Sequence, residues 1–156
     1  MKIPTGQEAK EKIQRYCTYQ ERSHQEVRNK LFEFGLPRKD VDEIISDLIT
    51  NGFLNEERFA KAFAGGKFRM KKWGRLKITH ALEGKGVSKN CIQIALKEID
   101  ENSYVNTLQQ LLSERSRFVE EDNVYVLRER LSKYAIQKGY EPELVWREIS
   151  VLIPKK

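Results

Sequence analysis

The sequence predicts an all-helical protein made of three tandem copies of a three-helix unit. Three glycines, Gly35, Gly86 and Gly139, recur at intervals of 51 and 53 residues. The apolar residues around them repeat with helical spacing, and only four prolines and nine glycines interrupt the 156 residues. Repeats of this kind stack on their neighbours, so an elongated, curved array is expected. The units are predicted at residues 1–53, 54–102 and 103–156.

The first helix of each unit carries its own apolar face. In the first copy the face is Ala9, Ile13, Tyr16 and Cys17, in the second Phe59, Ala60, Phe63 and Ala64, and in the third Val105, Leu108, Leu111 and Leu112. Asn55 is a predicted N-cap, because the acidic residues that follow it favour a helix N-terminus. Ser23 and Glu26 form a predicted capping box that opens the second helix of the first copy.

The second and third helices of each unit flank the glycine. Seven aligned columns are apolar or glycine in all three copies. They are Val27, Leu31, Gly35, Leu36, Val41, Ile45 and Leu48; then Ile78, Leu82, Gly86, Val87, Ile92, Leu96 and Ile99; then Leu131, Ala135, Gly139, Tyr140, Val145, Ile149 and Leu152. Residues spaced by three or four share one helix face, and a glycine just past a helix can adopt positive φ. Glu148 interrupts the stripe in the third copy and narrows it.

Positive charge is concentrated in the middle unit. The formal charge is +6, and residues 55–102 carry eleven Lys or Arg against six Asp or Glu. The basic run comprises Lys67, Arg69, Lys71, Lys72, Arg75, Lys77, Lys85 and Lys89, opposed by Glu83. Such a density of cations predicts a surface that binds phosphates or acidic side chains. Trp73 lies inside the run, where it either stacks on a base or packs against a neighbouring helix.

Other classes of site are not indicated. His24, His80, Cys17 and Cys91 fit caps, surfaces and cores, and no phosphate loop, nucleophile motif or metal-ligand spacing occurs. We therefore predict a protein that is not an enzyme and uses no metal or cofactor. A weaker cluster, Arg115, Arg117, Arg128 and Arg130, is diluted by acids and is interpreted as solvated or salt-bridged surface. No apolar run approaches the roughly 20 residues of a membrane span, and residues 1–6 lack the core of a signal peptide, so a cytoplasmic location without membrane contact is expected.

Three stretches of the sequence resemble the RecX family. They are Arg22–Leu31 followed by Gly35, then Gly52–Ala60, and then Gly74–Ile78 with Leu82–Val87. Their order and spacing match over about residues 9–153. The chain departs from the family pattern at Gln20, where an arginine is common, and at Gln137-Lys138, where paired basic residues precede the third glycine.

The resemblance implies a regulator of the bacterial RecA recombinase, active in recombination, DNA repair and the SOS response. RecX-like proteins bind the RecA filament on single-stranded DNA and suppress its ATPase and strand exchange. A monomer lying along the filament is expected, with contact to single-stranded DNA through RecA or directly. The predicted contact residues are Lys67, Arg69, Lys71, Lys72, Trp73, Arg75, Lys77, Lys85 and Lys89. Reversing Lys71, Lys72, Arg75 and Lys77 to glutamate should weaken inhibition without unfolding the protein.

Two other interpretations remain open. Three-helix units also build helix-turn-helix proteins, which bind DNA directly and would require no recombinase. A nuclease is the third possibility, and metal-dependent cleavage of DNA would reveal it.

Overall fold

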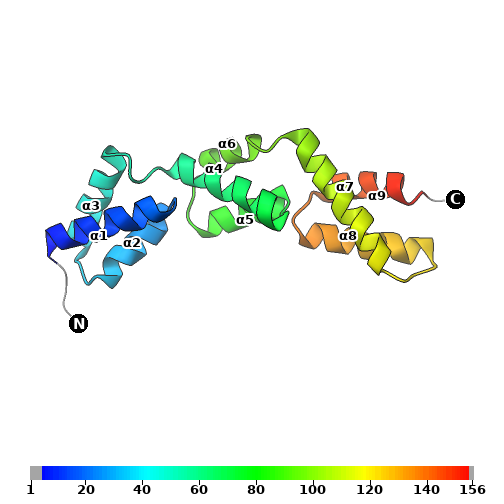
Figure 1. Ribbon diagram of the computed structural model, residues 1–156, viewed down its shortest axis with the longest axis horizontal. Helices are drawn as coiled ribbons and strands as arrows, with labels where there is room; N and C mark the ends of the chain where they lie inside the picture. The colour runs from blue at the N-terminus through cyan, green and yellow to red at the C-terminus, as the bar shows by residue number, and fades with distance from the viewer. Residues whose placement is uncertain (1–4, 155–156) are drawn as a thin grey trace. The chain divides into compact units, whose positions relative to one another are not determined.

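A computed structural model describes residues 5–154 of the chain. Every regular element in this range is helical, which confirms the predicted fold class (Figure 1). The elements are α1 (Gly6–Tyr19), α2 (His24–Glu33), α3 (Arg38–Thr50), α4 (Glu56–Gly66), the π-helix η1 (Lys67–Lys71), α5 (Arg75–Gly84), α6 (Lys89–Lys97), α7 (Glu101–Phe118), α8 (Val124–Gln137) and α9 (Pro142–Leu152). Residues 1–4, on which the expectation about a signal peptide partly depends, lie outside the described range.

The described chain forms two compact units. The first contains residues 5–63 with Leu82–Ala95, and the second contains Ala64–Ala81 with residues 96–154. The boundary passes through α4 and α5, so the middle repeat contributes to both units. The division of the sequence at residues 53 and 102 stays a prediction.

Helices α1, α2 and α3 pack together in the first unit (Figure 1). Their buried core consists of Ala9, Ile13, Cys17, Val27, Leu31, Leu36, Val41, Ile44, Ile45, Leu48 and Leu54. The capping box is confirmed: Glu26 N donates to Ser23 Oγ over 3.0 Å, and Ser23 N donates to Glu26 Oε1 over 3.2 Å. Burial raises the pKa of the Cys17 thiol, which suits a core residue.

Helices α7, α8 and α9 pack together in the second unit. Glu148 is buried, and its Oε1 accepts a hydrogen bond from Gln109 Nε2 over 2.7 Å, so a polar bridge replaces the apolar contact at this repeat position. Leu152 does not follow its column, because it is 39% exposed whereas Leu48 and Ile99 are buried. Since α9 ends at Leu152, little structure remains beyond it to cover the side chain.

Arg128 is a correction to the sequence interpretation. The sequence predicts a solvated or salt-bridged surface position for it, but only 6% of it is exposed. Its Nη1 donates to Ile153 O over 2.9 Å and its Nη2 to Ser150 Oγ over 3.0 Å. The guanidinium therefore satisfies a carbonyl at the C-terminal end of α9, where a positive charge is also favourable.

Candidate functional site

The basic run starts in an irregular stretch of helix. After α4 the chain continues as the π-helix η1, a form that is rare and often marks functional positions. Lys72 ends it with φ 58°, the only positive φ of a non-glycine residue in the described chain. This left-handed conformation costs a lysine about 1–3 kcal/mol, so it persists only where contacts with the surrounding structure offset that cost.

The third repeat supplies those surroundings. Tyr140 Oη donates a hydrogen bond to Lys72 O over 2.9 Å, and Lys138 Nζ donates to Lys71 O over 3.3 Å. Both donors belong to the turn that follows α8, at the predicted glycine Gly139. The C-terminal end of η1 is thus held by side chains that are far away in sequence.

Two glycines let the backbones of this junction approach closely. Gly74 N donates to Lys138 O over 2.8 Å, and Leu76 N donates to Gly139 O over 2.9 Å. A Cβ on Gly74 would overlap the Gly139 carbonyl, and a Cβ on Gly139 would overlap the Lys77 backbone. Gly139 also has φ 101°, a conformation that side chains rarely adopt.

Arg75 is held by a network with three other residues. Its Nη1 donates to Glu141 Oε2 over 2.8 Å, and its Nη2 donates to Glu101 Oε2. Its backbone N–H donates to Tyr104 Oη over 2.9 Å, while Tyr104 Oη donates to Glu141 Oε1. The guanidinium carbon also lies 3.8 Å from the centroid of the Tyr104 ring. Arg75 is therefore committed to joining the second and third repeats.

The network fixes the charge states of its members. Burial alone would raise the pKa of Glu141, but the hydrogen bonds from Tyr104 and Arg75 outweigh it, so the pKa of this carboxyl is lowered. Burial raises the pKa of both Tyr104 and Tyr140, and the nearby Glu141 raises each further. Burial opposes ionisation of Arg75, but its hydrogen bonds to Glu141 and Glu101 prevail and raise its pKa. At neutral pH the junction therefore contains a charged Arg–Glu pair and neutral tyrosines.

The exposed part of the basic run surrounds Trp73. Arg69, Lys71 and Lys77 are exposed, and Trp73 is half-buried. The Nζ atoms of Lys67 and Lys77 lie 5.1 and 4.7 Å from the Trp73 ring centroid. Cations over an indole ring are in cation–π contact. Trp73 and the basic residues between positions 67 and 77 other than Arg75 are called the basic segment below, and Arg69, Lys71 and Lys77 are its exposed cations.

Lys85 and Lys89 belong to the first unit, whereas the other seven predicted contact residues belong to the second. Lys85 Nζ lies 3.8 Å from Glu26 Oε1 and 5.7 Å from the Phe63 ring centroid. Lys89 is exposed at the start of α6. Lys85 therefore contributes to a contact between the first and second repeats.

Sequence reasoning missed the residues that hold the basic segment. Tyr104, Glu101 and Glu141 carry no motif, and Glu141 lies 66 residues from its partner Arg75. Two other residues at this junction had a signal: Lys138 is a basic residue directly before the third glycine, and Tyr140 belongs to one of the aligned columns.

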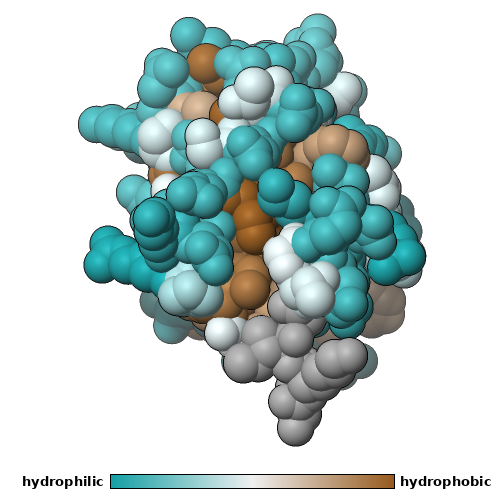
Figure 2. Space-filling model, turned by 90° about the vertical axis from the view of Figure 1, so that its left-hand side faces the viewer, coloured by the Kyte–Doolittle hydropathy of each residue, from teal (hydrophilic) through white to brown (hydrophobic). Residues whose placement is uncertain are grey.

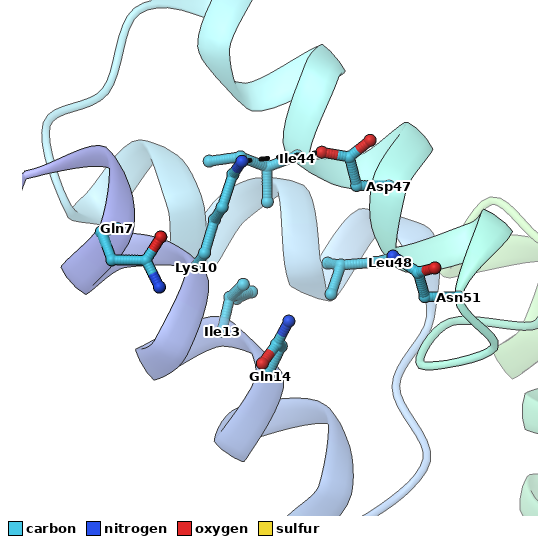
Figure 3. Close-up of a pocket in the computed structure, with 8 residues that line it drawn as sticks. All are labelled: Gln7, Lys10, Ile13, Gln14, Ile44, Asp47, Leu48 and Asn51. Atoms are coloured by element: carbon cyan, nitrogen blue, oxygen red, sulfur yellow. Dashed lines mark ion pairs between the residues drawn. The ribbon is translucent and has the colours of Figure 1, made fainter.

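A groove lies between α1 and α3 in the first unit. Figure 2 shows an apolar strip hollowed between hydrophilic side chains on this side of the molecule. Its volume is about 260 Å³, and Ile13, Ile44 and Leu48 are among its lining residues. Lys10 and Asp47 form an ion pair of 3.8 Å across it (Figure 3). Polar amides complete the rim, so the residues that line the groove carry no net charge.

Two features of the described residues concern other kinds of site. No group of three or more His, Cys, Asp or Glu side chains in residues 5–154 is arranged to hold a metal ion. None of the helices in this range is both long and apolar enough to cross a bilayer.

Comparisons with known proteins cover most of the chain. Residues 9–48 match the RecX first three-helix domain and residues 55–96 match the RecX second three-helix domain. The regulatory protein RecX of Clostridium perfringens (strain 13 / Type A) is 30% identical over 122 residues, covering 77% of this chain and 57% of that protein. The regulatory protein RecX of Prosthecochloris aestuarii is 26% identical over 138 residues, covering 88% and 89%.

A solved structure shares the fold. The crystal structure of RecX from Lactobacillus salivarius matches with a TM-score of 0.86 at 20% identity, covering 94% of this chain and 96% of that one. The chain spans little more than half of the length of several curated relatives, including the Clostridium perfringens protein. The two domain matches and the curated relatives establish that the chain belongs to the RecX family.

Proposed function

We propose that this protein is a non-enzymatic regulator that binds the RecA filament on single-stranded DNA and inhibits its ATPase and strand exchange. The relatives are named regulatory proteins, and family membership supports the same class of role here. The basic segment is the proposed contact with filament acids or DNA phosphates.

One observation supports this choice of surface. Tyr140 and Lys138 hold the backbone of the basic segment at Lys71 and Lys72, where Lys72 has an unfavourable conformation. The side chains of Arg69, Lys71 and Lys77 stay exposed. A surface that is ordered before binding loses less conformational entropy when a partner arrives, so its contacts yield more affinity. A merely solvated helix face would need no such support.

The hydrogen-bond network around Arg75 determines which substitutions can test the basic segment. Reversing Arg75 to glutamate would place a third carboxylate beside Glu101 and Glu141, so loss of function would report unfolding. Reversing Lys72 would alter a residue held at positive φ. Arg69, Lys71 and Lys77 are the suitable choice, because their head groups are exposed and no ion pair joins them to residues 103–154.

The experiment measures ATP hydrolysis by RecA on single-stranded DNA against the concentration of this protein. The triple variant Arg69→Gln, Lys71→Gln, Lys77→Gln should require about tenfold more protein for half-inhibition, since three charge contacts are lost. The matched control, Lys97→Gln, Arg117→Gln, Lys133→Gln, removes three exposed charges elsewhere in the second unit and should leave inhibition unchanged.

Two outcomes would contradict the proposal. Equal inhibition by both triple variants would remove the basic segment from the contact. Absence of any inhibition by the wild-type protein, together with tight binding to duplex DNA alone, would favour a direct DNA-binding protein.

A further inference from the structure

A second surface that combines cations with aromatic rings lies in the first unit. We call it the α1–α2 surface, and it consists of Lys12, Tyr16, Tyr19, Arg22, Lys30 and Phe34. The spacing of residues 12, 16 and 19 places them on one face of α1. This face differs from the one that lines the groove of Figure 3, which carries Gln7, Lys10 and Gln14. The surface was not apparent from charge counts, because residues 1–54 have equal numbers of acidic and basic residues.

Close contacts join the members into one continuous surface. Arg22 Cζ lies 3.7 Å from the Tyr16 ring centroid and 5.9 Å from the Tyr19 centroid. Lys30 Nζ lies 5.6 Å from the Tyr16 centroid and 6.0 Å from the Phe34 centroid. Lys12 Nζ lies 5.8 Å from the Phe34 centroid. The cations are therefore interleaved with rings rather than paired mainly with acids.

Arg22 is oriented before any partner binds. Its Nε donates to Tyr16 O over 3.0 Å while its guanidinium covers the Tyr16 ring. These contacts leave its two terminal amino groups for another acceptor. A planar guanidinium held in place by stacking fits the paired oxygens of a phosphate.

Tyr19 provides an exposed ring beside this guanidinium. It is the last residue of α1 and is 82% exposed. A single exposed aromatic residue is ordinary on a protein surface. Next to an oriented arginine, however, the ring offers a face on which a nucleobase can stack.

The acidic residues near this surface are largely engaged elsewhere. Glu21 accepts a hydrogen bond from Arg58 Nε over 2.7 Å. Glu26 caps α2 and pairs with Lys85. Glu33, which lies 3.5 Å from Lys30, and Glu8, which precedes Lys12 by one turn of α1, are the exceptions. The surface thus keeps a local excess of positive charge.

We propose that the α1–α2 surface is a binding site for single-stranded nucleic acid. Arg22 and Lys30 contact backbone phosphates, and Tyr19 stacks on an unpaired base. The exposed ring favours nucleic acid over an acidic peptide, because a carboxylate-bearing chain has no planar base to place on it. The site requires no recombinase and goes beyond the proposed function of the basic segment.

The test uses the full chain and fluorescence anisotropy with two labelled oligonucleotides, one of thymidines and one of equal length without bases. Tyr19→Ala should weaken binding to the thymidine oligonucleotide about tenfold and leave binding to the abasic one unchanged. Arg22→Gln should weaken both and should reduce the slope of log affinity against log salt by about one. Arg22→Lys keeps the positive charge but loses the planar guanidinium. Its affinity for both oligonucleotides should lie between those of wild type and Arg22→Gln.

Matched controls and contrary results complete the design. Tyr125→Ala removes a tyrosine that is 64% exposed in the second unit, and Arg28→Gln removes an α2 arginine that pairs with Asp42; neither should change binding. Repeating Tyr19→Ala in the Arg69, Lys71, Lys77 triple variant excludes a contribution from the basic segment. Wild-type binding by Tyr19→Ala and Arg22→Gln would overturn the site, even if RecA inhibition is intact. Equally tight binding of polyglutamate, equally weakened by Tyr19→Ala, would instead assign the surface to acidic protein.

Discussion

The turns at Gly86 and Gly139 occupy equivalent positions in successive repeats but make very different contacts. Beside Gly86, Lys85 reaches Glu26 of the preceding repeat at 3.8 Å, and a Cβ on Gly86 would meet nothing within 4 Å. The Gly139 turn instead approaches Gly74 through two backbone hydrogen bonds and leaves no space for a Cβ. The first contact is a partly exposed ion pair, whereas the second is close backbone packing supported by a partly buried network.

This difference shows that repeats of one sequence pattern need not couple with equal strength. An ion pair with exposed partners contributes about 0–1 kcal/mol, because water and salt screen it. Close packing and hydrogen bonds between half-buried charged groups contribute more, and removing one partner leaves the others unsatisfied. The second unit therefore holds the basic segment firmly, and three comparisons of decreasing expected effect can test this.

The largest effect is expected from the glycines themselves. Gly139→Ala should lower the free energy of unfolding by about 3 kcal/mol, because it combines a strained φ with overlap against the Lys77 backbone. Gly86→Ala, with φ 76° but open space, should cost only about 1 kcal/mol. Urea denaturation followed by circular dichroism measures both, and equal losses would show that the two turns are packed alike.

An intermediate effect is expected from the charged partners of the two turns. Arg75→Met keeps the aliphatic stem but leaves Glu141 without its guanidinium, so we expect a loss of about 2 kcal/mol. Lys85→Met, the matched change at the other turn, should cost less than about 0.5 kcal/mol. A loss for Lys85→Met as large as that for Arg75→Met would refute the contrast.

The smallest effect concerns pH. The pKa of Glu141 is lower in the folded protein than in the unfolded chain, so its stabilisation is present above about pH 4.3. It is lost as pH falls through the folded pKa, because the carboxylate must then be protonated. The free energy of unfolding should therefore fall more between pH 5 and pH 3 for wild type than for Glu141→Gln, by on the order of 1 kcal/mol. Parallel pH profiles would mean that Glu141 is not stabilised by its partners.

Much of the fold was predictable because its signals are local. The capping box at Ser23, the N-cap at Asn55 and the positive φ of Gly35, Gly86 and Gly139 involve only residues within one helix turn. Helical spacing likewise predicted most of the buried columns. The two exceptions, Leu96 and Leu152, lie at the C-terminal ends of α6 and α9.

The residues of the candidate site could be predicted from the sequence, but which of them are exposed to a partner could not. Charge density identified the basic run, yet it could not separate Arg75, which is bound within the protein, from Lys71, which is exposed. Counting charges also overlooked the α1–α2 surface, because it cannot show that Glu21 and Glu26 are engaged by Arg58 and Lys85. Such distinctions depend on partners that are distant in sequence.

The sequence by itself determined the helices, the glycine turns between them and the concentration of positive charge in the middle repeat. These features follow from residue periodicity and backbone preferences over a few neighbouring residues. Only the tertiary structure decided which cations remain exposed and that Lys72 adopts a left-handed conformation. Those outcomes depend on Tyr104, Tyr140 and Glu141, which contact the basic run only after the chain has folded.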